Sequence, residues 1–176
     1  MANARPNKVS YTAMQLGANV DTATTGVWTM ALSAAGTPAG TYTLHKAAAA
    51  TTSVLHLPVP NPTIEDGRLA LVEVFYLVTT ANLTSAPTFV LNKMSYPGGA
   101  GTGLVALAAV TQTLTFAGKD TVGTAAGAGA AGSHIAVIQV TTPTLAADTD
   151  SYHLQLTMNE AATSVLDIFG LTATYI

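Results

Sequence analysis

The stretch IEDGRLALVEVFYLVTTAN, residues 64 to 82, decides the fold. After the turn at Asp66-Gly67, the chain reads as an extended strand, in which successive side chains point to opposite faces. One face holds Ala70, Val72, Val74, Tyr76 and Val78, and the other holds Leu69, Leu71, Glu73, Phe75 and Leu77. A strand with one solvated face alternates apolar with polar residues, but here both faces are apolar apart from Glu73. We therefore expect protein on both sides of this strand.

Strand-like segments separated by turn residues recur along the rest of the chain. They cover residues 27–32, 41–46, 54–57, 87–91, 110–116, 134–140, 152–158 and 167–176. About eight or nine short strands with Gly, Pro and Asx turns predict an all-β, antiparallel β-sandwich with a jelly-roll-like arrangement. We assign residues 21–176 to this single sandwich domain and residues 1–20 to an extended, polar N-terminal arm.

Alternation within the strands predicts which side chains form the core. Trp28 occupies an apolar strand position, and Tyr42 and Leu44 are expected to face inward. In the 152–158 segment the expected core residues are Tyr152, Leu154, Leu156 and Met158.

Charge is scarce in this chain. Charged residues make up 9% of its 176 residues, against about 25% in ordinary soluble domains. The net charge is −3, and the six basic residues are scattered, which disfavours nucleic-acid binding. No apolar run approaches the ~20 residues of a membrane-spanning helix. A signal peptide would need an apolar segment after its basic residues, and none follows Arg5 and Lys8. Without cysteine the chain has neither disulfides nor thiolate chemistry.

No catalytic or cofactor site is predicted. The four histidines form no HxH pair, and strand alternation places three of them outward, so we predict no metal site. Glycoside hydrolysis requires two carboxylates that face each other across a cleft. Glu73, Glu160 and Asp167 are available, but their spacing in the sequence does not show that any two of them meet. The glycine loop GGAGTG lacks the Lys-Ser/Thr of a phosphate loop. We predict that the protein is not an enzyme.

Glu73 leads to a hypothesis about partners. A carboxylate inside a single-chain core would cost several kcal/mol unless it were paired. We therefore place Glu73 on the outer face, covered by a neighbouring subunit or by the N-terminal arm and paired there. The alternative is that Glu73 lies at an open sheet edge and its neighbours pack under a loop.

Three segments give the chain a resemblance to a known class of proteins. They are GRLALVEVFYLVTTANLTSAP (67–87), DTDSYHLQLTMN (148–159) and LDIFGLTATYI (166–176). With the loops rich in Thr, Ala and Gly, they resemble small, cysteine-free phage virion proteins of jelly-roll type, the trimeric cement or decoration proteins of capsids. The resemblance implies a homotrimer seated on the major capsid protein, with the arm around Arg5 and Lys8 reaching over a neighbouring capsid subunit.

The expected function is therefore that of a virion structural protein on the capsid surface, assembled in the host cytoplasm. It would use no cofactor and contact neither nucleic acid nor membrane. The alternative is a receptor- or carbohydrate-binding fibre or tail module of a phage. Such a module is expected to have aromatic platforms on its loops, but only 6% of the residues are aromatic. The predicted partner-binding residues are Arg5, Lys8, Leu69, Leu71, Glu73 and Phe75.

Overall fold

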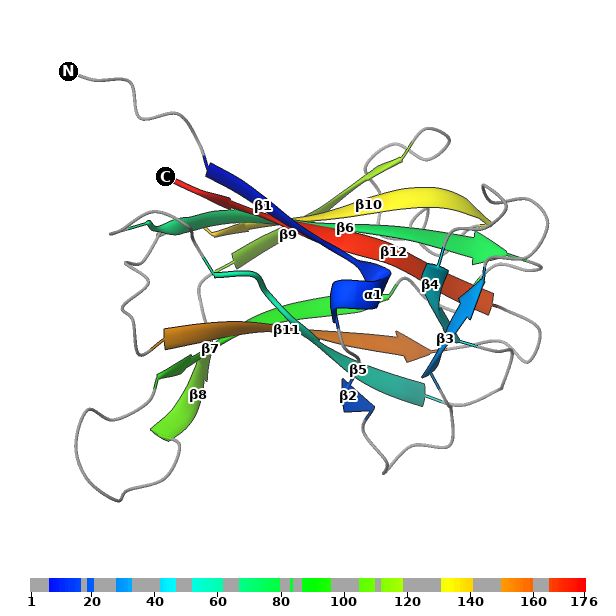
Figure 1. Cartoon of the computed structure of the whole chain (residues 1–176), viewed down its shortest axis with the longest axis horizontal. Coiled ribbons are helices and arrows are strands. Elements are labelled where there is room, and N and C mark those ends of the chain that lie inside the picture. Colours follow the sequence, from blue (N-terminus) through cyan, green and yellow to red (C-terminus); the bar gives the residue numbers. More distant parts are fainter. Residues whose placement is uncertain are drawn as a thin grey trace.

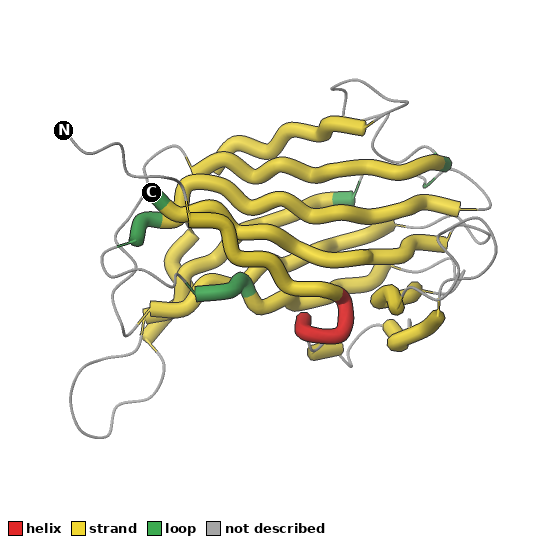
Figure 2. Tube along the Cα trace, turned by 45° about the horizontal axis from the view of Figure 1, so that its top comes forward, coloured by secondary structure: helices red, strands yellow, loops and turns green. Residues whose placement is uncertain are grey.

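The strands stack as two antiparallel sheets (Figure 1 and Figure 2). The structure is a computed structural model that describes residues 7–16, 19–20, 28–32, 42–46, 52–61, 67–79, 83, 87–95, 105–109, 112–118, 131–140, 150–159 and 165–176. The seven-stranded sheet has the order β3-β4-β12-β6-β10-β9, with β1 also paired to β12. The five-stranded sheet has the order β2-β5-β11-β7-β8.

The strand bounds follow the sequence pattern closely over most of the chain. The seven-stranded sheet contains β1 (Asn7–Thr12), β3 (Trp28–Leu32), β4 (Tyr42–Lys46), β6 (Leu69–Thr79), β9 (Gln112–Gly118), β10 (Gly132–Val140) and β12 (Val165–Tyr175). The five-stranded sheet contains β2 (Asn19–Val20), β5 (Thr52–Pro58), β7 (Thr88–Ser95), β8 (Val105–Ala109) and β11 (Asp150–Asn159). A short helix, α1 (Ala13–Leu16), follows β1. No helix among the described residues has the length and apolarity to cross a membrane.

Eight of the described strands have the connectivity of a jelly roll. Their orders are β4-β12-β6-β10 in one sheet and β5-β11-β7-β8 in the other. The chain crosses repeatedly between the sheets, which gives the paired Greek keys of this architecture. The predicted all-β antiparallel sandwich is confirmed. Strands β1, β2, β3 and β9 extend the two sheets.

The core lies between the inner sides of the sheets. On β6, the face opposite Glu73 was expected to form the core. Its residues Val72, Val74, Tyr76 and Val78 are buried there as predicted, but Ala70 is only half-buried. Trp28, Leu44 and, on β11, Tyr152, Leu154 and Leu156 are also buried as predicted. The side chain of Met158 lies outside the described part. Tyr42 was predicted to face inward, but its side chain is 45% exposed. It begins β4, and β12 pairs only with Leu44–Lys46, so Tyr42 projects beyond the covered part of the strand.

The N-terminal segment is part of the sandwich rather than a detached arm. β1 pairs with β12 from Asn7 opposite Tyr175 to Thr12 opposite Gly170 (Figure 1). α1 then buries Ala13 and Leu16 completely in the core. The segment looked polar because an edge strand alternates exposed with half-buried residues, and only one of its faces meets the core. Residues 1–6 lie outside the described part.

Gly170 allows β1 to lie this close to β12. A Cβ atom at Gly170 would lie 2.6 Å from the carbonyl oxygen of Tyr11, which is closer than real Cβ contacts. Next to it, the pairing of β12 with β6 shifts register between Ile168 and Gly170. Such a bulge changes the strand direction locally, and β12 exchanges β4 for β1 as its neighbour at this point.

Candidate functional site

The outer side of the seven-stranded sheet has an apolar centre. β10 pairs with β6 so that Ile135 lies opposite Phe75 and Val137 lies opposite Glu73. These residues are half-buried, whereas their neighbours on the inner side of each strand are buried. We define the outer apolar face as five neighbouring side chains: Leu71, Phe75, Leu77, Ile135 and Val137.

Polar residues border this apolar centre. Ser133 and Gln139 are exposed on β10, at either end of its apolar positions. On β1, Lys8 and Ser10 are exposed, and the Ser10 Oγ lies 2.9 Å from the Thr172 Oγ1 on β12. No described element lies over this side of the sheet in Figure 1 or Figure 2. The described strands therefore present a partly solvated apolar surface inside a polar border.

Glu73 lies on the outer side, as expected, and the N-terminal segment supplies its counter-charge. The Glu73 Oε2 is 3.7 Å from the Lys8 Nζ, and the two side chains are 23% and 61% exposed. An ion pair this exposed contributes only about 0 to 1 kcal/mol. Strand β6 lies between β12 and β10, so the alternative position at an open sheet edge is wrong.

One predicted partner-binding residue is in the core. Leu69 was placed with Leu71 on the outer face, but its side chain is fully buried. The register between β6 and β12 shifts at Ala70, because Thr174 pairs with Leu71 while Tyr175 pairs with Leu69. The extra residue reverses the alternation and turns Leu69 inward. Arg5 lies outside the described residues.

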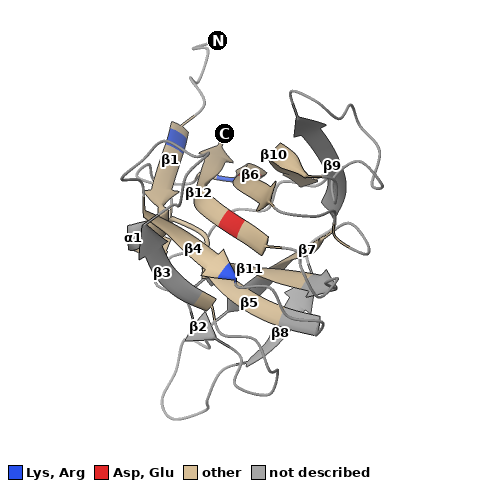
Figure 3. Ribbon diagram, turned by 90° about the vertical axis from the view of Figure 1, so that its right-hand side faces the viewer, with Lys and Arg blue, Asp and Glu red and all other residues tan. Residues whose placement is uncertain are grey.

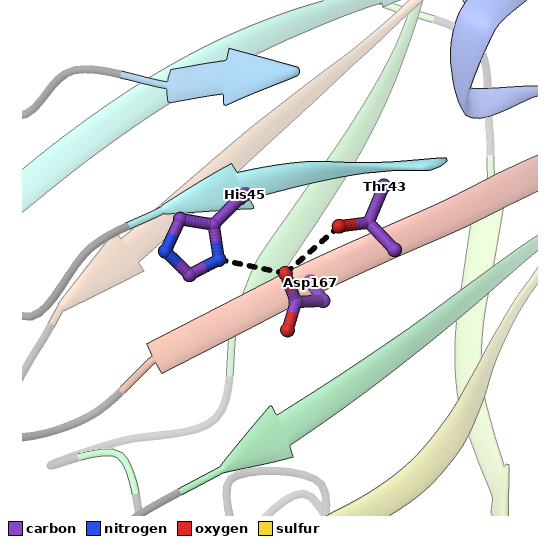
Figure 4. Close-up of polar contacts among 3 residues, drawn as sticks. All are labelled: Thr43, His45 and Asp167. Carbon is purple, nitrogen blue, oxygen red and sulfur yellow. Dashed lines mark hydrogen bonds and ion pairs between the residues drawn. The ribbon is translucent and has the colours of Figure 1, made fainter. Parts of the chain in front are cut away.

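A polar cluster lies at one end of the outer side of this sheet (Figure 4). The Asp167 Oδ1 accepts a hydrogen bond from the Thr43 Oγ1 at 3.0 Å and lies 2.8 Å from the His45 Nδ1. Asp167 belongs to β12, whereas Thr43 and His45 are alternate residues of β4. The Asp167 side chain is 10% exposed, and its bonds join β4 to β12.

The carboxylates considered for glycoside hydrolysis do not come together. Asp167 pairs in register with Leu77, and Glu73 lies four residues away along β6. At about 3.3 Å per residue this separation is roughly 13 Å, more than the ~5 to 9.5 Å between the carboxyl groups of glycosidases. Glu160 lies outside the described residues. Glu73 and Asp167 therefore do not form a hydrolytic pair.

The four histidines occupy different places. His134 is buried on the inner side of β10 and stacks on Tyr76, with ring centroids 5.0 Å apart. His45 contacts Asp167, while His56 and His153 lie on the other sheet. Within the described ranges, no three or more His, Cys, Asp or Glu residues are grouped to hold a metal ion.

Two residues of the outer apolar face were missed in the prediction of partner-binding residues. Ile135 and Val137 belong to HIAVIQV, residues 134 to 140, which is almost wholly apolar. Residues 134–140 are apolar on both faces, as β6 is. This shared pattern could have identified residues 134–140 as a strand next to β6. Leu77 was assigned to the outer face but was not among the predicted partner-binding residues.

No protein family matches the sequence, and no curated protein shows significant similarity to it.

Proposed function

We propose that this protein is a non-enzymatic virion structural protein of the capsid cement or decoration type. It forms a homotrimer on the capsid surface and binds the major capsid protein, or another virion protein, after assembly in the host cytoplasm. The proposal involves no cofactor, nucleic acid or membrane.

The observation that supports this function best is the outer apolar face. Leu71, Phe75 and Leu77 lie beside Ile135 and Val137 in adjacent strands, and all five are half-buried rather than covered. Removing apolar surface from water contributes about 25 cal/mol per Å². A flat sheet side of this kind therefore gains free energy when another protein covers it.

The surroundings of this face also favour a protein partner. An apolar centre inside a polar border is the usual composition of a protein interface. Charged residues are sparse on the described strands (Figure 3). The carboxylate within the face, Glu73, already has Lys8 as its counter-charge, so little unpaired charge would have to be desolvated when a partner binds. A capsid offers many copies of one binding surface, and a trimer that binds several of them gains avidity from contacts that are weak one by one.

The receptor- or carbohydrate-binding alternative would be supported by exposed aromatic side chains. Among the described side chains, the exposed large hydrophobic ones are Tyr42 and Ile176. Trp28, the only tryptophan, is buried in the core. Within the part of the chain that the structure describes, a single exposed tyrosine does not make a stacking platform for sugars, so the described surface favours the capsid role of the two.

The proposal is tested on purified virus particles from the source of this chain. We expect the protein at a fixed copy number per particle, and particles that lack it should lose heat resistance. When added back, the wild-type protein should bind such particles. Phe75→Glu, which puts a charge in the apolar centre that joins the copies of the trimer, should bind weakly, because a monomer lacks the avidity of the trimer.

Gln155→Glu is the matched control, because it adds the same charge to a half-buried outward position of the other sheet. Circular dichroism should show both variants folded. Equal attachment of Phe75→Glu and wild type, or full heat resistance without the protein, would refute the capsid role. Specific binding on a glycan array would favour the alternative.

A further inference from the structure

Two histidines that are 97 residues apart in the sequence meet on the outer side of the five-stranded sheet. β5 and β11 are antiparallel neighbours, with His56 opposite Gln155 and His153 opposite Pro58. His56 and His153 are therefore diagonal neighbours across two adjacent strands. Such pairs have Cα atoms about 7 to 8 Å apart, within reach of long or aromatic side chains.

Both imidazoles lie on the side away from the core. Their strand neighbours Leu55, Leu57 and Leu154 are fully buried. Because side chains alternate along a strand, His56 and His153 must point outward, and both are half-buried. They are therefore accessible to a small solute from the solvent side.

His56 is also close enough to His153 to affect the ionisation of His153. Burial lowers the pKa of His153 below its usual value, and the charge of His56 lowers it further. Imidazole binds metal ions in its uncharged form, and a lowered pKa favours that form.

We propose that His56 and His153 together bind one divalent transition-metal ion such as Zn²⁺, Ni²⁺ or Cu²⁺, through one ring nitrogen each. Imidazole is a preferred ligand of these metals. Each ring has a second nitrogen, which can keep a hydrogen bond while the first binds the metal.

Water completes the coordination, and a neighbouring amide can hold one of these waters. Asn92 of β7 lies opposite His153, and its Nδ2 donates to the Val90 carbonyl at 3.4 Å. Its Oδ1 is then the amide atom left to accept a hydrogen bond from a metal-bound water. With two protein imidazoles, the site is more open than a structural zinc centre with four protein ligands. It lies on the opposite side of the sandwich from the outer apolar face, so it does not depend on the proposed function.

The test is titration of the untagged full-length protein with ZnCl₂ by isothermal calorimetry at pH 7.5. We expect one saturable site per chain. His56→Gln and His153→Gln should each weaken Zn²⁺ binding at least about tenfold, and the double variant should be little worse than either, because one substitution already removes the bidentate site. His45→Gln, which changes the half-buried histidine of the other sheet, should leave the affinity unchanged.

A second measurement on the unaltered chain keeps the test decisive if a glutamine variant fails to fold. Electron paramagnetic resonance of the protein with one equivalent of Cu²⁺ should show hyperfine coupling to two imidazole nitrogens. No saturable Zn²⁺ binding, unchanged binding in the double variant, or a Cu²⁺ spectrum without two imidazoles would each overturn the proposal.

Discussion

Two carboxylates on the outer side of the seven-stranded sheet have very different surroundings. Asp167 is nearly buried and accepts a hydrogen bond from Thr43, with the His45 ring nitrogen also within bonding distance. Glu73 is more exposed, and it pairs with the end of a long, solvated lysine side chain, that of Lys8. A buried donor that loses its acceptor costs more free energy than a solvated pair that separates.

We therefore expect Asp167→Ala to lower the free energy of unfolding by about 1 to 3 kcal/mol, since it leaves the buried Thr43 hydroxyl unsatisfied. Glu73→Ala is the comparison, and it should cost less than about 1 kcal/mol. Urea unfolding of both variants, monitored by circular dichroism, measures the difference. Equal losses would show that the cluster around Asp167 does not hold β4 to β12.

His153 should make stability depend on pH. Its pKa is lower in the folded protein than in the unfolded chain, because of burial and then the charge of His56. The unfolded chain therefore binds the proton more tightly, and stability falls as the pH drops below about 6.5, the ordinary histidine pKa. Above that pH, both states are neutral at this position and the contribution to stability is complete.

The measurement is the free energy of unfolding at pH 7.5 and pH 5.5. Wild type should lose more stability between these values than His153→Gln, and Thr157→Ala, on the same outward side of β11, should behave like wild type. An identical loss in wild type and His153→Gln would contradict the lowered pKa.

Among the elements, most strands could be predicted from their own sequence pattern, whereas β1, β2, β8 and α1 could not. β6, β10, β11 and β12 have patterns that are set locally by burial on one or both faces. β8 was hidden in LVALAAV, residues 104 to 110, whose small apolar side chains do not distinguish a strand from other structures. β1 and α1 were read as an arm because their stability depends on distant partners in β12.

Integration of the N-terminal segment gives a prediction opposite to that for a free arm. Removing residues 1 to 12 deletes β1 and exposes the edge of β12, so the sandwich should be clearly destabilised. Leu16→Ala should cost about 2 to 5 kcal/mol, as other truncations of fully buried leucines do.

The control for the deletion of residues 1 to 12 is removal of only residues 1 to 6, which keeps every pair between β1 and β12. Thermal unfolding by calorimetry measures all three, and unchanged unfolding without β1 would mean that its pairing contributes nothing.

The outer apolar face could be predicted only in part, because alternation within a strand can be read from the sequence but the pairing between strands cannot. Leu71, Glu73 and Phe75 were assigned correctly to the outer side, because alternation within one strand needs no information about its neighbours. Leu69 was wrong because a bulge at Ala70 shifts the alternation, and bulges depend on the partner strand. The diagonal approach of His56 and His153 follows from pairing between β5 and β11, which spacing along the chain does not reveal.

Over the molecule as a whole, the two outer sides of the sandwich differ in chemistry. The described outward residues of the seven-stranded sheet include the outer apolar face, whereas those of β5, β7 and β11 include His56, His153, Gln155 and Asn92. The first side gains free energy by leaving water, and the second is suited to remain in it. Association through this protein should therefore be one-sided and driven by apolar contact.

An apolar, one-sided contact makes a specific prediction for self-association. Among the described residues, one ion pair lies on the outer side near the apolar centre, between Lys8 and Glu73. Both partners belong to the same chain, so this pair does not join two copies. Salt should therefore not weaken an oligomer formed there. We expect sedimentation velocity to show the same oligomer at 0.05 M and 0.5 M NaCl, and Ile135→Lys to shift it to monomer. Gln139→Lys adds the same charge at an exposed position of the same strand and side, and it should leave the oligomer intact. Dissociation of the oligomer by salt would show that its contacts are ionic. Equal dissociation by both lysine variants would show that its contacts lie elsewhere. Either result would mean that the apolar centre does not join the copies.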